Sequence, residues 1–206
     1  MSAREEVLGR IRTALGPQRP QVAVPPLPAP RELPAAALLD LLADRVADYR
    51  ATVLRCAPAE VPATVVRGLD AALGAGRDPA GVVVAPGVPA AWRPVGSVED
   101  DGRPAPELAA FAATLTGVAT AVAETGTLVL DGSPRSGRRA LSLLPDVLVC
   151  VVEAAQVVPD VPDALARLDP RAPLTMVSGP SATSDIELQR VEGVHGPRTL
   201  VVVLAG

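Results

Sequence analysis

The chain has 206 residues, about half of them apolar, and a formal net charge of −4 in which every basic residue is an arginine. A Schiff-base or pyridoxal site and a P-loop all require lysine, so its absence excludes those chemistries. With 2 cysteines, 1 histidine and only one residue each of Trp, Tyr and Phe, the chain also lacks the side chains for an internal iron–sulfur cluster, a histidine-rich zinc site or a surface that stacks nucleic-acid bases. We therefore expect no cofactor, no metal and no nucleic-acid partner.

The length and composition predict one globular domain with a core of ordinary size. No apolar run reaches the roughly 18 residues that a membrane-spanning helix needs. Residues 1–7 are charged and amphipathic, unlike the apolar segment of a signal peptide. These features predict a cytoplasmic protein without a membrane span.

An N-terminal arm comes first. Residues 2–15 predict an amphipathic helix with apolar side chains on one face, and Gly16 ends it. The prolines concentrated between residues 17 and 34 favour an extended, semi-rigid connector. The helix then either docks on a partner or a second subunit, which would make a homo-oligomer, or folds back onto its own domain. We therefore divide the chain into an arm, residues 1–34, and an α/β domain, residues 35–206.

The α/β domain shows helical and strand-like patterns in alternation. The expected strands are residues 51–56, 81–85, 93–98, 115–123, 127–130, 147–152, 174–177 and 199–204, and the expected helices are residues 38–50, 60–75, 107–113, 138–144 and 162–168. Several of the strands are continuous apolar runs, which suit strands that are covered on both faces. The alternation predicts an α/β fold with a mostly parallel sheet flanked by helices.

Two polar stretches interrupt this pattern at strand ends. Glu124-Thr-Gly126 reads as a tight turn in which Gly126 supplies a positive φ, and it places a carboxylate at the end of a strand. Residues 131–139 form a second polar stretch, which we interpret as a loop that is able to move. Its last two residues, Arg138 and Arg139, stand at the start of a predicted helix.

A longer polar loop spans residues 178–187. Gly179 and Pro180 end the preceding strand, and Ser181 and Thr183 supply hydroxyl groups. Ser184 and Glu187 have the spacing of a capping box at the start of a short helix, with Asp185 in its first turn, so Asp185 and Glu187 also have purely structural roles open to them. Unpaired N–H groups beside hydroxyls attract an anion or a carbonyl oxygen. The residues therefore predict a binding pocket.

Three segments carry a resemblance to a known family. They are Ala123-Glu-Thr-Gly-Thr127, Leu143-Leu-Pro-Asp146, and residues 178–187 followed by Gly193-Val-His-Gly-Pro197. Together they resemble the lactate utilization protein C family, whose domain is called the LUD domain. The resemblance implies a fold like that of ribose-5-phosphate isomerase, glucosamine-6-phosphate deaminase and the coenzyme A transferases. It also implies a part in oxidising L-lactate to pyruvate, with two partner proteins that carry iron–sulfur clusters.

We expect the polar segments to line one crevice at the C-terminal edge of the sheet, where open α/β sheets commonly bind ligands. The predicted ligand-binding residues are Thr125, Gly126, Thr127, Arg138, Arg139, Gly179, Ser181, Thr183 and Asp185. The two arginines would supply a fork for a carboxylate or a phosphate. This predicts a site for a small anionic ligand.

Two residues are candidates for catalysis. Glu124 resembles the glutamate nucleophile of coenzyme A transferases, although it also suits hydrogen bonding to turn N–H groups. His195 titrates near neutral pH and suits acid/base chemistry, although a histidine in a turn also serves as a hydrogen-bonding support. Whether the chain is an enzyme stays open. Besides a subunit of the lactate oxidation system, an independent acyl- or phosphoryl-transfer enzyme and a structural adaptor without a working site both fit.

Overall fold

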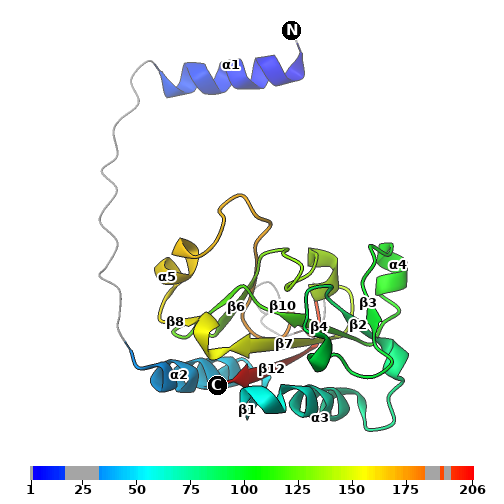
Figure 1. Cartoon of the computed structure of the whole chain (residues 1–206). Coiled ribbons are helices and arrows are strands. Elements are labelled where there is room, and N and C mark those ends of the chain that lie inside the picture. Colours follow the sequence, from blue (N-terminus) through cyan, green and yellow to red (C-terminus); the bar gives the residue numbers. More distant parts are fainter. Residues whose placement is uncertain (1, 17–32, 184–190, 193–195) are drawn as a thin grey trace.

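The computed structural model describes residues 2–16, 33–183, 191–192 and 196–206. Its centre is a six-stranded sheet in the order β1-β12-β7-β4-β2-β3, in which every neighbouring pair is parallel. These strands are β1 (Thr52–Cys56), β2 (Val82–Val84), β3 (Val98–Glu99), β4 (Ala113–Gly117), β7 (Val147–Glu153) and β12 (Thr199–Ala205). Figure 1 shows helices flanking this sheet. The predicted α/β fold is confirmed.

A second, four-stranded sheet has the order β8-β5-β6-β9. Its strands are β5 (Thr120–Val122), β6 (Thr127–Leu130), β8 (Val157–Val158) and β9 (Thr175–Val177), and β6 pairs antiparallel with both β5 and β9. A two-stranded pair joins β10 (Ala182–Thr183) to β11 (Val191–Glu192). The predicted single strand over residues 115–123 is wrong, because the chain leaves the first sheet after Gly117 and enters the second at Thr120.

Helices cover both faces of the six-stranded sheet. The helices of the α/β domain are α2 (Ala35–Asp48), α3 (Val61–Leu73), α4 (Ala105–Leu108) and α5 (Val161–Ala166), with 3₁₀ turns η1 (Pro58–Glu60), η2 (Pro79–Gly81), η3 (Ala90–Trp92), η4 (Arg139–Ser142) and η5 (Ala154–Gln156). Of these, α3 lies on one face of the six-stranded sheet and α2 on the other, whereas α5 contacts β5 and β8 of the second sheet. The helix predicted over residues 138–144 is therefore only the short turn η4. The helix predicted over residues 107–113 is α4, which ends at Leu108, before β4 begins.

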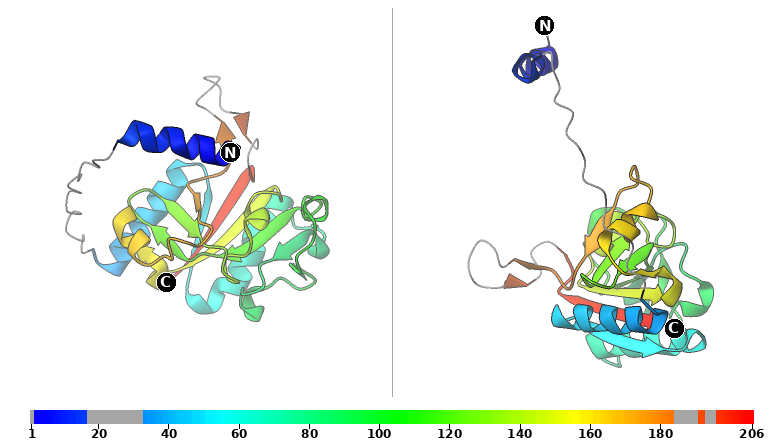
Figure 2. Two further views of the ribbon diagram at one scale, coloured as in Figure 1. Left: turned by 90° about the horizontal axis from the view of Figure 1, so that it is seen from above. Right: turned by 90° about the vertical axis from the view of Figure 1, so that its left-hand side faces the viewer.

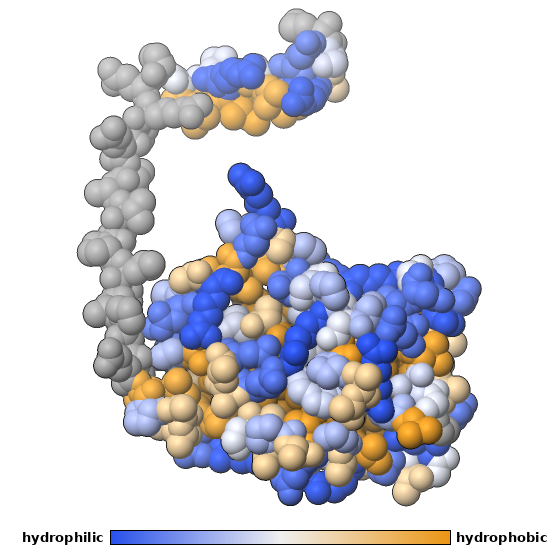
Figure 3. Space-filling model, in the orientation of Figure 1, coloured by the Kyte–Doolittle hydropathy of each residue, from blue (hydrophilic) through white to orange (hydrophobic). Residues whose placement is uncertain are grey.

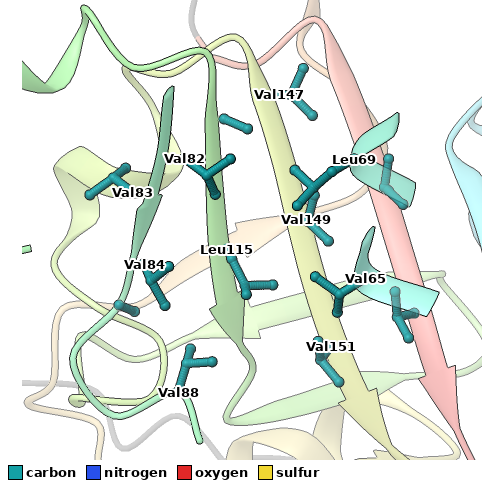
Figure 4. Close-up of a cluster of buried hydrophobic side chains, with 14 of the residues drawn as sticks. Val65, Leu69, Val82, Val83, Val84, Val88, Leu115, Val147, Val149 and Val151 are labelled. Carbon is teal, nitrogen blue, oxygen red and sulfur yellow. The ribbon is translucent and has the colours of Figure 1, made fainter. Parts of the chain in front are cut away.

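Alternate residues of β7 face two different cores. Val149 packs with α3 and with β2, as Figure 4 shows, whereas Cys150 packs with α2 and with the four-stranded sheet. Both residues are fully buried, because successive side chains of a strand point to opposite faces. The six-stranded sheet therefore lies between a layer that contains α3 and a layer made of α2 and the second sheet.

The amphipathic pattern predicts the N-terminal helix α1 (Ala3–Leu15), which begins with a capping box between Ser2 and Glu5. None of its residues is buried, and Val7, Ile11 and Leu15 are 56%, 49% and 57% exposed. Figure 2 shows the helix apart from the α/β body, and Figure 3 shows apolar residues along one side of it. The proline-rich connector falls largely outside the described residues.

In the part of the chain that the structure describes, no helix is both long enough and apolar enough to cross a membrane.

The polar loop over residues 131–138 lies on the C-terminal ends of β2 and β4. The Gly117 N–H donates to the carbonyl of Arg135 at 3.0 Å, and the Gly87 N–H donates to the carbonyl of Pro134 at 2.8 Å. A Cβ atom at Gly87 would lie 2.6 Å from the carbonyl carbon of Pro134, so the contact requires glycine there. The Arg135 guanidinium also stacks over the Trp92 ring at 4.8 Å. These contacts anchor the loop on the strand ends.

The same loop ends in an ion pair between Arg138 and Asp100. Arg138 Nε donates to Asp100 Oδ2 at 2.7 Å, and Nη2 donates to Oδ1 at 2.9 Å, a two-point contact with a carboxylate whose side chain is 4% exposed. This contact, with desolvation opposing it, lowers the pKa of Asp100. Arg138 therefore ties the end of the loop to the segment after β3.

Replacing Arg138 with glutamine is expected to lower the free energy of unfolding at pH 7 by about 2 kcal/mol, because it leaves a buried carboxylate without its cation. Since the folded pKa of Asp100 is lowered, this stabilisation is present at neutral pH and is lost as the pH falls through that pKa. Urea titrations between pH 7 and pH 2 should show the two proteins converging in stability. Arg139→Gln, at an exposed neighbour, is the control, and a stability difference that does not change with pH would contradict the assignment.

Candidate functional site

Two of the segments that carry the family resemblance meet where β7 and β12 begin. The Thr199 N–H donates to the carbonyl of Asp146 at 3.2 Å, and Arg198 donates to the Asp146 carboxylate through Nε and Nη2 at 2.7 and 2.6 Å. This contact with Arg198 lowers the pKa of Asp146. Because neighbouring parallel strands start at the same edge, residues 143–146 and 196–198 lie together at the N-terminal edge of the sheet.

The segment over residues 123–127 and the first part of the third segment, residues 178–187, meet through the pairing of β6 with β9. Leu128 lies opposite Val177 in this antiparallel pair, so Thr127 and Ser178 are neighbours at its end. Their hydroxyl oxygens are 2.8 Å apart, and Thr127 Oγ1 lies 2.7 Å from Thr125 Oγ1. Thr127 is only 7% exposed. Three hydroxyl groups thus form a continuous hydrogen-bonded chain from the turn at residues 124–126 to the polar loop.

A hollow of about 240 Å³ lies where these segments converge. Its lining combines the end of β9 and the loop that follows with residues before β7 and β12: Ser142, Leu143, Thr175, Met176, Val177, Ser178, Gly179, Pro180, Ser181, Gly196 and Pro197. The Ser181 N–H donates to the carbonyl of Pro197 at 2.9 Å and joins two of the walls. We call this space the serine hollow.

A second hollow of about 450 Å³ lies between the end of α2 and the turn at residues 124–126. Its lining residues are Arg45, Asp48, Tyr49, Glu124 and Thr125, and we call it the Arg45 hollow. The hydroxyl chain that starts at Thr125 ends at Ser178, in the lining of the serine hollow. The two hollows are therefore linked by hydrogen bonds between hydroxyl groups.

The C-terminal end of α2 holds both polar turns in place. Gly126 and Gly179 have φ values of 61° and 85°, which favour glycine. A Cβ atom would lie 2.9 Å from the carbonyl carbon of Arg45 at Gly126, and 2.5 Å from Cβ of Tyr49 at Gly179. Both glycines thus combine a positive φ with close contact to α2, and the positive φ predicted for Gly126 is confirmed.

The expectation that the polar segments converge agrees with this geometry, but the expected edge is wrong. Residues 124–127 and 178–181 come together through the four-stranded sheet, and the serine hollow lies at the N-terminal edge of β7 and β12. The C-terminal ends of β2 and β4 are instead covered by residues 131–138. The crevice that was expected at that edge is filled by the chain's own loop.

The structure places the predicted site residues at several different points. Thr125 lines the Arg45 hollow, Gly179 and Ser181 line the serine hollow, and Gly126 and Thr127 lie between the two. Glu124 is exposed at the Arg45 hollow, and its N–H donates to the carbonyl of Pro159 at 3.0 Å.

Arg138 is paired with Asp100 near the C-terminal edge of the six-stranded sheet, and Arg139 is an exposed residue of η4. The structure therefore does not bring the predicted arginine fork to either hollow. Thr183 belongs to β10. Asp185, His195 and the predicted capping box of Ser184 and Glu187 lie outside the described residues. Among the residues whose positions are given, no group of three or more His, Cys, Asp or Glu side chains is arranged to hold a metal ion.

Sequence reasoning missed Arg45, Tyr49 and Ser142. Arg45 and Tyr49 end an ordinary amphipathic helix, and nothing in its pattern sets them apart from other exposed positions. Ser142 falls in a turn where we predicted a longer helix. These residues can be recognised only in the folded chain, because only there do Gly126 and Gly179 contact the end of α2.

Comparisons with known proteins agree with the resemblance seen in the sequence. A family model described as the LUD domain matches residues 85–205. The chain is 44% identical to lactate utilization protein C of Deinococcus radiodurans, over 99% of this chain and 96% of that protein. It is 34% identical to lactate utilization protein C of Bacillus pumilus, over 55% of this chain and 49% of the relative.

A solved structure is also similar. It is the crystal structure of a DUF162 family protein from Deinococcus radiodurans, which matches with a TM-score of 0.70 and 36% identity and covers 85% of this chain and 100% of that chain.

Gly179→Ala is expected to lower the free energy of unfolding by more than about 2 kcal/mol, since a positive φ costs an L residue about 1–2 kcal/mol and the new methyl group would also clash with Tyr49. Gly74→Ala is the matched control, because Gly74 has a φ of 91° and no atom within 4 Å of an added Cβ. Urea titration of both variants separates backbone strain from packing. Equal losses would show that the contact with α2 contributes nothing.

Proposed function

Because the chain belongs to the LUD domain family, we propose that it acts in lactate utilization as a subunit that takes part in the oxidation of L-lactate to pyruvate. The names of its relatives support the role in lactate utilization. The finer parts of the proposal are a small anionic ligand, bound at the two hollows, and iron–sulfur partner proteins that accept the electrons.

One observation carries the proposal of a ligand site. The segments that resemble the family are separated by long stretches of sequence, yet their described residues surround the serine hollow and the hydroxyl chain beside it. Leu143 and Pro197 lie on one side, Ser178 and Ser181 on another, and Thr127 reaches Ser178 through its hydroxyl. A structural role alone does not require three such segments to converge on one solvent-filled space.

The chemistry of the serine hollow suits a small oxygen-rich molecule. Its lining residues include Ser142, Ser178 and Ser181, whose side chains carry hydroxyl groups, together with other residues of the polar loop. Hydroxyl groups both donate and accept hydrogen bonds, so they can bind the hydroxyl of lactate and the keto oxygen of pyruvate alike. At about 240 Å³ the hollow is suited to a molecule of this size rather than to a large cofactor.

The cysteines of this chain support the proposal that partners accept the electrons. Cys56 and Cys150 are both buried, on strands β1 and β7, and burial raises the pKa of the Cys150 thiol to about 12. A thiol in such surroundings is not a thiolate at neutral pH and is a poor cluster ligand. The two electrons released when L-lactate becomes pyruvate would then pass to iron–sulfur groups on other proteins, as the family resemblance implies, and the two protons would pass to solvent.

The proposal predicts a specific growth defect. Deleting the coding sequence in the native host should abolish growth on L-lactate as sole carbon source and leave growth on pyruvate unchanged. Thr127→Val, which keeps the side-chain shape and removes the central hydroxyl of the chain, should fail to restore growth on L-lactate, whereas Ser97→Ala, outside both hollows, should restore it. Growth rates and the cellular level of the soluble variant would be measured together.

Normal growth of the deletion strain on L-lactate would contradict a role in lactate utilization. Full rescue by Thr127→Val would instead contradict the ligand site and leave the pathway role in place.

The exposed apolar side of α1 favours an additional adaptor role. Val7, Ile11 and Leu15 recur at every fourth position on one face, as in helices that dock into an apolar groove.

Changing Val7 and Ile11 together to serine should reduce the iron–sulfur protein that co-purifies with a tagged full-length chain by about tenfold, because two buried apolar contacts would be lost. Absorbance near 400 nm and mass spectrometry of the eluate would report it. Arg4→Ser and Arg12→Ser, made together at charged positions of the same helix, form the control. Unchanged recovery with the Val7 and Ile11 variant would argue against α1 as the docking element.

A further inference from the structure

Arg45 is a cation placed beside the segment that carries Glu124. It lies in the last turn of α2, in the lining of the Arg45 hollow, together with Asp48, Tyr49, Glu124 and Thr125. Among the described residues that line the serine hollow, by contrast, none carries a charged side chain. Of these two hollows, the Arg45 hollow is therefore the one whose described lining offers a cation to an anion.

The guanidinium of Arg45 is weakly held within the described part of the protein. Its recorded partner there is Asp48, at 3.7 Å between Nη1 and Oδ2, which is too long for a hydrogen bond. The side chain is half exposed, at 50%. Arg138 and Arg198, by comparison, each make two hydrogen bonds of 2.6–2.9 Å to one carboxylate. The N–H groups of Arg45 are thus available to a ligand carboxylate.

The backbone beneath Arg45 is fixed. Val46, the next residue, is 1% exposed in the core between α2 and the sheets. Gly126 packs directly on the backbone of Arg45, where a Cβ would lie 2.9 Å from its carbonyl carbon. The glycine that shapes the turn at residues 124–126 therefore also sets the distance between that turn and Arg45. An arginine projecting from a rigid element beside a hydroxyl is a favourable arrangement for two-point carboxylate binding.

We propose that Arg45 is the anion-binding residue of the site and that it holds the carboxylate of a small 2-hydroxy or 2-keto acid in the Arg45 hollow. This inference rests on the proposed function and adds the residue and the ligand class. Thr125, at the start of the hydroxyl chain, forms a hydrogen bond with the oxygen on the second carbon of the acid. It donates to a keto oxygen there, and it donates to or accepts from a hydroxyl group. The chain through Thr127 to Ser178 holds the Thr125 hydroxyl in position.

The charges around Arg45 select a monoanion. Asp48 is 3.7 Å from its guanidinium, and Glu124 lines the same hollow. The guanidinium attracts an anion while the acidic side chains oppose it, and this opposition grows with the ligand's charge, so a single carboxylate is favoured over a phosphate dianion. The Arg45 hollow therefore discriminates against phosphorylated ligands, which the predicted fork of Arg138 and Arg139 would have accepted.

The test measures binding of L-lactate, pyruvate and inorganic phosphate to the full-length protein by isothermal titration calorimetry and ligand-observed NMR. Wild type is expected to bind L-lactate or pyruvate and to bind phosphate at least about tenfold more weakly. Arg45→Gln should weaken carboxylate binding roughly tenfold to a hundredfold, the range for loss of a charge-assisted hydrogen-bond pair. Arg45→Lys should retain part of the affinity, and Asp48→Asn should bind as tightly as wild type or more tightly.

Arg139→Gln is the matched control, because it removes an exposed arginine that lies outside the lining of both hollows. Circular dichroism and thermal melting would establish that each variant is folded. Equal carboxylate affinity of Arg45→Gln and wild type would overturn the assignment of Arg45 and leave the proposed function standing. Phosphate binding as tight as carboxylate binding would overturn the ligand class. Failure of wild type to bind either acid would overturn this inference, whereas the proposed pathway role is decided separately by the growth of the deletion strain on L-lactate.

Discussion

The contact between the end of α2 and two glycines is the constraint on which the candidate site depends. Gly126 and Gly179 have positive φ values, and each lies so close to α2 that a side chain would overlap its backbone or Tyr49. The antiparallel pairing of β6 with β9 then fixes the register between the two turns, so that Thr127 and Ser178 share a hydrogen bond. Without either contact, the polar segments would have no fixed position relative to Arg45.

This arrangement moves the site away from the edge that parallel sheets usually use. At the C-terminal ends of β2 and β4, carbonyl groups of the loop over residues 131–138 accept hydrogen bonds from strand-end N–H groups that would otherwise be free for a ligand. The loop is anchored by Arg138 on Asp100 and by Arg135 on Trp92. The space left for a ligand lies instead where β7 and β12 begin and where the second sheet diverges from the first.

The sequence was sufficient for those features that depend on local pattern. Apolar runs such as residues 147–152 and 199–204 identified the central strands, because only side chains buried on both faces tolerate such runs. Gly126 was identified as the residue with positive φ for the same local reason. The motifs also indicated which residues come together in the fold, because hydroxyl residues and glycines in such motifs are typical of a turn or a pocket.

What the sequence could not supply was the choice of neighbours. The run over residues 115–123 combines apolar residues with threonine and a glycine, all of which one strand tolerates, so its pattern does not mark Gly117 as the point where the chain changes sheets. The alternation of helices and strands also does not predict the second sheet. That sheet is what places the candidate site at the N-terminal edge of the first sheet.

The distribution of arginine partners explains why Arg45 rather than Arg138 suits a ligand. Because the chain has no lysine, arginine supplies its side-chain cations, apart from a protonated histidine. Arginine residues must therefore form the ion pairs that stabilise the fold and also bind any anionic ligand. Two-point pairs such as Arg138 with Asp100 and Arg198 with Asp146 consume donors and stabilise loops at the two edges of the sheet. An arginine already bound in this way must lose those hydrogen bonds before it binds a ligand, and for Arg138 that exposes a buried carboxylate. Among the described residues, Arg45 has only the 3.7 Å contact with Asp48 to give up, so the anion binding that we propose there would cost less stability than at Arg138.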